Sequence, residues 1–215
     1  MDTADLIRAL AANARPVRRL RPPLLRAALW LMLAAAILGL LTVSHGLRPR
    51  LAERMSDPAF ATSLIASALT GVLAAISAFM LSLPDRSRAW ILLPAPALAV
   101  WLANIGYQCF AGWVSLPPGA VTVEAASSCV ATLVLTSLPL SLVLLAMLRH
   151  AAALRPFSVV LAGSLAVSAV TSTALSLFHP LDATVIVLGW NLGTAVLFTG
   201  LAALFGRGPG RGSPR

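Results

Sequence analysis

The sequence contains no lysine and only seven acidic residues, and charged residues make up just 11% of the chain. The few charges avoid the middle turns of the long apolar blocks, where Asp, Glu and Arg do not occur. Proteins that move ions or protons usually keep an ionisable residue inside a membrane span, because such a residue is costly to bury and is retained for its function. The charge distribution therefore disfavours a pump or an ion transporter.

Catalytic and nucleic-acid-binding motifs are also missing from the sequence. It has no phosphate-binding glycine loop, no zinc-protease helix and no nucleophile elbow, so we expect neither an enzyme nor a cofactor. It has no recognition module for nucleic acid either. The net charge of +9 is therefore expected to reflect membrane topology and contact with anionic membrane lipid, with no direct binding of nucleic acid.

Apolar residues, which form 59% of the chain, gather in six long blocks separated by Pro, Arg and Asp. Each block approaches the roughly 20 residues that a helix needs to cross a bilayer, and backbone groups in lipid must be paired within a helix. The sequence predicts an all-α polytopic membrane protein, a bundle of six transmembrane helices over residues 24–205, between a leader (1–23) and a disordered tail (206–215). The predicted spans are Leu24–Val43, Ala59–Leu83, Ala89–Val114, Ala125–Leu148, Phe157–Phe178 and Ala183–Phe205.

The arginines predict the orientation of this bundle, since arginine near a span tends to stay in the cytoplasm. Thirteen of the sixteen basic residues lie on the side of the leader, and three lie in the first loop on the other side, at Arg48, Arg50 and Arg54. We therefore expect both termini to be cytoplasmic. Arg26, Arg88, Glu124 and Arg149 lie at span ends, where their side chains can extend to the interface.

Polar residues within the spans allow a second interpretation. Asn104 and Gln108 are four residues apart and so share one helix face; we expect hydrogen bonds between helices, which commonly join packed membrane helices. A polar path along these two residues and Asn191 would instead suit a small transporter or channel-like protein. Gly189 and Gly193 form a GxxxG spacing that is compatible with close packing, a homodimer or a structural membrane subunit.

Prolines within the predicted spans are expected to interrupt or bend their helices, because proline removes a hydrogen-bond donor and crowds the preceding turn. They are Pro94 and Pro96 in the third span and Pro139 in the fourth.

The two cysteines, Cys109 and Cys129, fall near the side opposite to the leader, together with His179. In a bacterium that side is the oxidising periplasm. Three interpretations remain open: two separate small apolar residues, a disulfide across the third outer loop, or part of a thiolate and imidazole site for a soft metal.

The leader begins with a segment whose pattern is that of a short amphipathic helix. Leu6, Ile7 and Leu10 form an apolar stripe, and charged residues lie mostly on the other face. Because so short a helix is marginal alone in water, we expect it to fold against a partner protein or the membrane surface. The alternative is a basic anchor that only fixes topology.

The leader and the first outer loop resemble the NrsF-like bacterial membrane proteins, a family named as negative regulators of sigma F. The resemblance lies in Asp5-Leu6-Ile7, Leu10-Ala11, Pro16-Val17-Arg18-Arg19-Leu20, Pro22-Pro23, Leu47-Arg48-Pro49 and Asp57-Pro58-Ala59-Phe60, followed by the spans. It implies an anti-sigma factor in the bacterial inner membrane that holds an extracytoplasmic-function sigma factor and releases it under stress. The implied docking residues are Leu6, Ile7, Leu10, Val17 and Leu20, with Arg18 and Arg19 pairing to acidic groups of the sigma factor.

The resemblance also implies sensing residues at the periplasmic side. Members carry one cysteine near the outer start of the fourth helix, which Cys129 matches, and another before a proline at the outer end of the fifth, where this chain has His179. A pair of Cys129 and His179 on a metal, or a disulfide with Cys109 as the substitute, would then be the sensor of a redox or metal signal.

Overall fold

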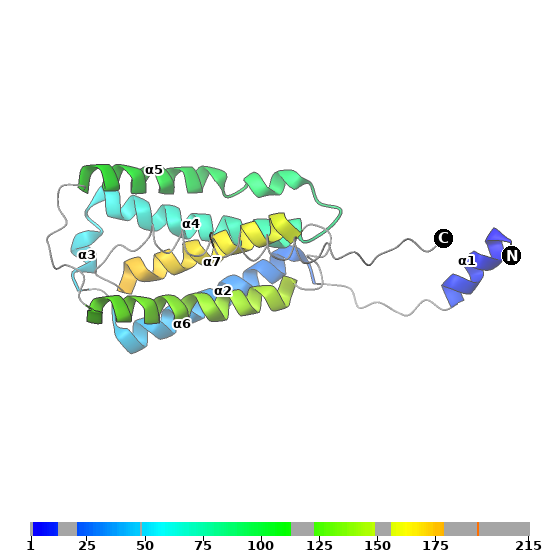
Figure 1. Ribbon diagram of the computed structural model, residues 1–215, viewed down its shortest axis with the longest axis horizontal. Coiled ribbons are helices and arrows are strands. Elements are labelled where there is room, and N and C mark those ends of the chain that lie inside the picture. Colours follow the sequence, from blue (N-terminus) through cyan, green and yellow to red (C-terminus); the bar gives the residue numbers. More distant parts are fainter. Residues whose placement is uncertain are drawn as a thin grey trace.

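The computed structural model describes residues 2–12, 21–47, 49–112, 123–148, 156–178 and 193. Within these residues all regular structure is helical, and no strand occurs. The helices, shown in Figure 1, are α1 (Thr3–Ala12), α2 (Pro23–His45), α3 (Leu51–Arg54), α4 (Pro58–Leu81), the 3₁₀ helix η1 (Arg88–Leu92), α5 (Ala95–Gly112), α6 (Val123–Leu148) and α7 (Pro156–Phe178).

The long helices form an up-and-down bundle with α4 and α7 at its centre. Figure 1 shows α5 on one side of α4, and α2 and α6 on the other side of this central pair. The helix α7 has 78% of its span buried and α4 has 61%, against 11% for η1 with α5. We call the end where α2 and α7 begin and α4 and α6 end the leader end, and the opposite end the far end.

Five helical segments are long and apolar enough to cross a membrane, which makes the chain a membrane protein. They are Pro23–Ser44, Pro58–Leu81, Arg88–Tyr107, Ala131–Leu148 and Phe157–Phe178. These correspond to the first five predicted spans. The sixth predicted span (183–205), apart from the single residue Gly193, and the tail (206–215) lie outside the described residues.

The third span is not one continuous helix. It consists of η1 and α5, with a turn at Leu93 and Pro94 between them. Proline has no N–H to continue the ladder of helical hydrogen bonds. The expected interruption is confirmed at Pro94, whereas Pro96 fits within the first turn of α5 and Pro139 lies inside α6.

Small side chains allow α4 and α7 to pack closely. A Cβ added at Gly71 of α4 would lie 3.0 Å from the side chain of Val170 of α7, and the Ser67 and Thr173 hydroxyls are 3.0 Å apart across the same interface. Membrane helices associate by this kind of close approach and by polar bonds, because lipid provides no hydrophobic force between them. The central pair is therefore closely packed, with the outer helices around it.

The fold of the far end includes one hydrogen bond that the sequence predicts. The Asn104 amide of α5 donates to the Ala59 carbonyl of α4 over 2.7 Å, which confirms a bond between helices for this residue. The side chain of Gln108 lies outside the described residues.

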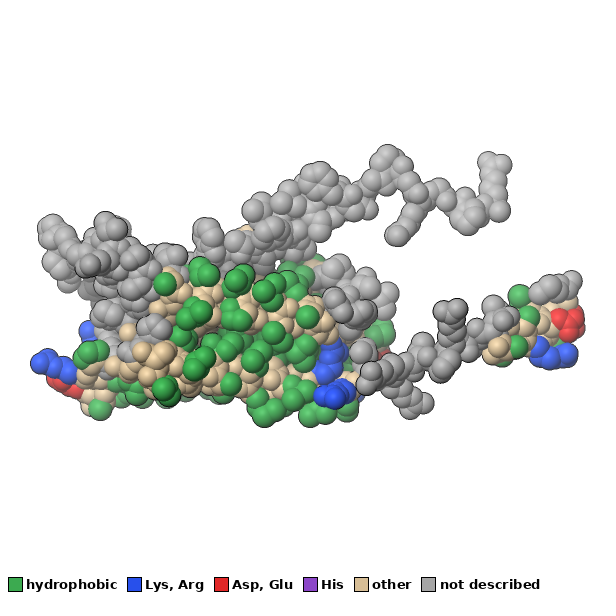
Figure 2. Space-filling model, turned by 90° about the horizontal axis from the view of Figure 1, so that it is seen from below, with side chains coloured by type: hydrophobic (Ala, Val, Ile, Leu, Met, Phe, Trp, Pro, Cys, Tyr) green, Lys and Arg blue, Asp and Glu red, His purple; other side chains and the backbone are tan. Residues whose placement is uncertain are grey.

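The surface has the pattern of a membrane-embedded bundle. In Figure 2, hydrophobic side chains cover the middle of the visible face, and charged side chains gather at its two ends. The exposed large apolar residues include Met32 and Leu40 of α2 and Leu142 and Leu145 of α6. Such an apolar band suits contact with lipid tails. The charged ends suit the polar borders of a membrane.

Candidate functional site

The leader begins with α1, whose described side chains are all exposed. Leu6 is 45% exposed and Ile7 is 61% exposed, so both apolar side chains are accessible on this helix. Asp5 and Arg8, one turn apart on the same helix, form a solvent-exposed ion pair with 3.5 Å between Nη1 and Oδ1. An exposed pair of this kind contributes little to stability. The exposed apolar side chains of α1 are accessible to a partner.

The other predicted docking residues are described less fully. Leu10 belongs to α1, but its side chain lies outside the described residues, as do Val17, Arg18, Arg19 and Leu20 altogether. The structure therefore brings Leu6 and Ile7 together on one helix and leaves the rest of the predicted docking surface as a prediction.

The chain re-enters the described region at Arg21, next to the leader end of the bundle, and Arg26 follows in the first turns of α2. The sequence suggested that Arg26 extends to the interface, and this was wrong, because the residue is only 6% exposed. Its Nη2 donates to the Met147 carbonyl of α6, and its guanidinium lies over the Phe79 ring of α4, 5.1 Å from the centroid. Arg26 thus connects three helices.

The charge of Arg26 is buried without an ion pair to any carboxylate among the described residues. Phe79 and Met147 both lie in the last turn of their helices, since α4 ends at Leu81 and α6 at Leu148. Each helix C-terminus carries about half a negative charge, and its last carbonyls lack helical donors. The contact with a terminal carbonyl of α6 and the ring face of Phe79 therefore both favour a positive charge at this position.

Trp30 makes a second contact of the same kind, one turn further into α2. Its Nε1 donates to the Leu140 carbonyl of α6 over 3.1 Å, and the side chain is fully buried. Arg26 and Trp30 are four residues apart and therefore share one face of α2. We call these two side chains with their two acceptor carbonyls, at Leu140 and Met147, the α2–α6 connection. Periodicity alone did not reveal it, because it depends on which helix lies beside α2.

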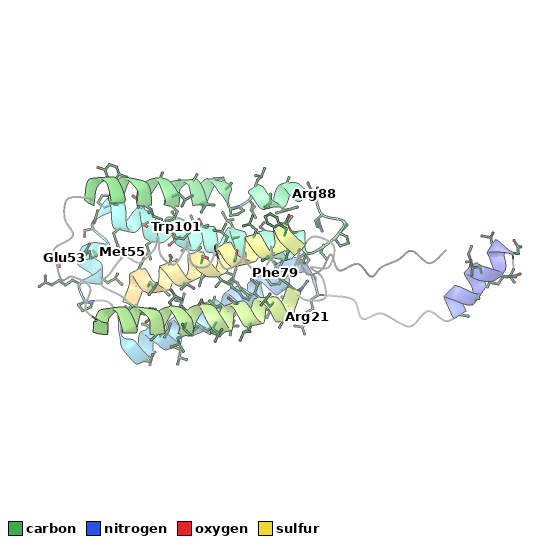
Figure 3. The ribbon with its side chains drawn as sticks, in the orientation of Figure 1. Arg21, Glu53, Met55, Phe79, Arg88 and Trp101 are labelled. Atoms are coloured by element: carbon green, nitrogen blue, oxygen red, sulfur yellow. The ribbon has the colours of Figure 1, made fainter. Side chains whose placement is uncertain are left out.

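The leader end also carries exposed basic groups. Figure 3 shows Arg21, Phe79 and Arg88 toward this end of the bundle, whereas Glu53 and Met55 lie at the far end. Arg21 and Arg88 are exposed, as the sequence predicts for Arg88. Exposed arginines at a span end favour the cytoplasmic side of a membrane.

Two of the three predicted sensing residues belong to helices that reach the far end. Cys109 lies near the end of α5 and Cys129 near the start of α6. Their side chains lie outside the described residues, and so does His179 as a whole. Among the residues that the structure does describe, no group of three or more His, Cys, Asp or Glu side chains is placed to hold a metal ion. The proposed disulfide and metal pairs remain predictions.

Comparison with known proteins gives one clear result. A family model described as NrsF, negative regulator of sigma F, matches residues 10–208. The matched range includes the second half of the leader and the whole described bundle, and it starts after Leu6 and Ile7. Searches of curated proteins and of solved structures found no match.

Proposed function

The chain belongs to the NrsF family of negative regulators of sigma F, and we propose from this that it is a membrane-bound anti-sigma factor. In this proposal the leader binds an extracytoplasmic-function sigma factor at the bacterial inner membrane and so keeps it from RNA polymerase. A periplasmic redox or metal stress signal releases it. The bundle anchors the leader and receives the signal.

The observation that carries the proposal, beside the family match, is the exposure of the apolar residues of α1. Leu6 and Ile7 are accessible on a helix of ten residues, and a helix of this length is marginal in water without a partner. Placing such a stripe in an apolar groove is a common mode of peptide recognition. Full burial of one leucine or isoleucine stabilises a complex by about 1.5–3 kcal/mol, which is enough to control binding.

The basic residues support the proposed orientation. Sigma factors act in the cytoplasm, so the leader must be cytoplasmic to bind one. Arg21 directly precedes α2, and Arg88 begins η1 at the same end of the bundle, both of them exposed. The positive-inside rule favours a cytoplasmic position for these residues, and we propose that Arg18 and Arg19 pair there with acidic groups of the sigma factor.

The alternative of a small transporter or channel receives less support. That alternative was based on a polar path through Asn104, Gln108 and Asn191. The amide of Asn104 is hydrogen-bonded to a backbone carbonyl of α4 instead. That bond gives Asn104 a packing role. The family description names a regulator rather than a transporter or an enzyme.

Leu6→Asp is the sharpest test of the docking surface. The full chain is reconstituted in lipid nanodiscs, and its affinity for the sigma factor recovered from the same cells is measured. We expect the dissociation constant to rise by about tenfold or more, since the variant loses the apolar burial of Leu6 and also places a carboxylate in an apolar groove, where an unpaired charge is costly.

Ala12→Asp provides the matched control, because Ala12 lies on the opposite face of α1 and receives the same added charge. An aspartate near a helix C-terminus also weakens the helix, so this control detects any effect of helix loss alone. We expect Ala12→Asp to bind nearly as well as the unmodified chain. Equal affinities for Leu6→Asp and Ala12→Asp would overturn the proposed docking surface.

A further inference from the structure

The helix α6 connects the two regions on which the proposed function depends. Cys129 lies in its second turn at the far end, and Met147 lies in its last turn at the leader end. At 1.5 Å per residue this separation is about 27 Å along the axis. Pro139 lies between them and removes one backbone donor from the ladder. The helix nevertheless continues through Pro139, so one element joins the far end to the leader end.

The leader end of α6 is in contact with the first turns of α2, which follow the leader directly. Arg26 donates to the Met147 carbonyl and Trp30 to the Leu140 carbonyl. These two acceptors are seven residues apart, or two helical turns, so they lie on one face of α6. Two donors on one face of α2 thus bind two acceptors on one face of α6.

The two side chains that donate these hydrogen bonds are enclosed by the protein. Arg26 and Trp30 are buried, and the Arg26 guanidinium is held against the Phe79 ring from the other side. Hydrogen bonds inside such a low-dielectric interior are electrostatically stronger than in water, and an unpaired polar group there is costly. The Nη1 atom of Arg26 is already buried without a hydrogen-bond partner among the described residues. Loss of the bond to Met147 would leave still more of the charged group unpaired, so α2 is held to follow α6.

We propose that Arg26 and Trp30 are positioning residues that fix the first turns of α2, and with them the end of the leader at Arg21, to the cytoplasmic half of α6. This inference rests on the proposed function, because it assigns the structural route by which a change at the far end reaches the docking segment. A signal that shifts α6 then moves the attachment point of the leader. Coupling of this type requires that α6 has two arrangements. It also requires that these two arrangements differ in their free energy of interaction with the signal.

The test measures the position of this attachment point directly. Spin labels are placed at Arg21→Cys and Leu145→Cys, both exposed positions, in a full chain whose native cysteines are replaced by serine. The distance distribution between the labels is recorded by pulsed electron paramagnetic resonance in lipid nanodiscs. We expect one narrow peak for this reference protein.

Arg26→Met is the main variant, since methionine removes the donors and the buried charge, and its flexible side chain fills much of the same space. We expect it to lose the narrow peak and give a broad distribution, with Arg26→Lys between the two because lysine keeps the charge but not the planar donor geometry. Arg88→Met is the matched control, as it removes an exposed arginine from the same end of the bundle. An unchanged narrow peak in Arg26→Met would overturn the inference.

Trp30→Phe keeps the inference testable if Arg26→Met does not fold. It removes one indole donor and retains an aromatic ring, and we expect partial broadening of the same distribution. Trp101→Phe is its control, because the Trp101 Nε1 has no hydrogen-bond partner among the described residues. If Trp30→Phe and Trp101→Phe both give the reference distribution, the positioning role is refuted.

Capture of the sigma factor by the same nanodiscs separates this inference from the proposed function. A reference protein that captures no sigma factor would refute the proposed function whatever the distances are. A reference protein that captures it, with distances that do not depend on Arg26 or Trp30, would refute only the positioning role.

Discussion

Two tryptophans of the bundle provide a direct comparison of a satisfied and an unsatisfied buried donor. Trp30 and Trp101 are both fully buried. The Trp30 Nε1 donates to the Leu140 carbonyl over 3.1 Å, whereas the Trp101 Nε1 has no partner among the described residues. We predict that Trp30→Phe lowers the free energy of unfolding more than Trp101→Phe does.

The expected difference follows from the hydrogen bond, because both substitutions remove the same atoms and leave a similar cavity. At Trp30 the lost bond contributes about 0.5–1.5 kcal/mol, and at Trp101 the removal of an unpaired buried donor returns about 1–3 kcal/mol. Trp30→Phe should therefore be less stable than Trp101→Phe by at least about 1.5 kcal/mol, which is slightly more than tenfold in the unfolding equilibrium.

The measurement is reversible unfolding by sodium dodecyl sulfate in mixed micelles, followed by far-ultraviolet circular dichroism. Tryptophan fluorescence is unsuitable, since each variant removes one of the five tryptophans. Equal stabilities, or a lower stability for Trp101→Phe, would refute the assignment of the Trp30 bond as a connection between α2 and α6.

Three further predictions concern the leader, the far end and the packing of α5. Replacement of Arg18 and Arg19 by alanine should lower the association rate with the sigma factor about tenfold at low salt and weaken its salt dependence, because charges at an interface mainly steer the encounter; stopped-flow rates at several salt concentrations that do not change would contradict this. Cys129→Ser combined with His179→Ala should abolish the induction of a sigma-dependent reporter by thiol-reactive metals or oxidants, and a normal response would remove both residues from the sensor. Asn104→Leu should lower the free energy of unfolding by about 0.6 kcal/mol, up to about 1.7, the range of bonds between membrane helices; unfolding in the same mixed micelles at unchanged or higher stability would contradict a packing role.

Much of the bundle follows from patterns that act locally along the chain. The lengths of the apolar blocks predict the first five spans. Within lipid, a single segment that crosses the membrane can pair its backbone groups only as a helix. The interruption at Pro94 follows from the missing donor of proline in the same local way. The sequence also locates Asn104 as a residue that bonds between helices, although not its acceptor in α4.

The buried position of Arg26 could not be predicted, because it depends on neighbours that are distant in the sequence. Its acceptor Met147 lies 121 residues further along the chain, and the ring of Phe79 comes from a third helix. An arginine near a span end ordinarily reaches the interface. The acceptor at the end of α6 and the ring of Phe79 surround this arginine only once the bundle is assembled, and no periodicity in α2 records where they lie.

Dependence of sigma-factor capture on the leader tests the central claim most directly. Detergent-solubilised native membranes are subjected to affinity purification with the full chain and with a variant that lacks residues 2–21, at equal amounts of each protein in the membrane. An anti-sigma factor that binds through its leader should recover a sigma factor with the full chain and lose it with the shortened one. Recovery by both proteins would contradict the assignment of binding to the leader, and recovery by neither under non-inducing conditions would contradict the anti-sigma function itself.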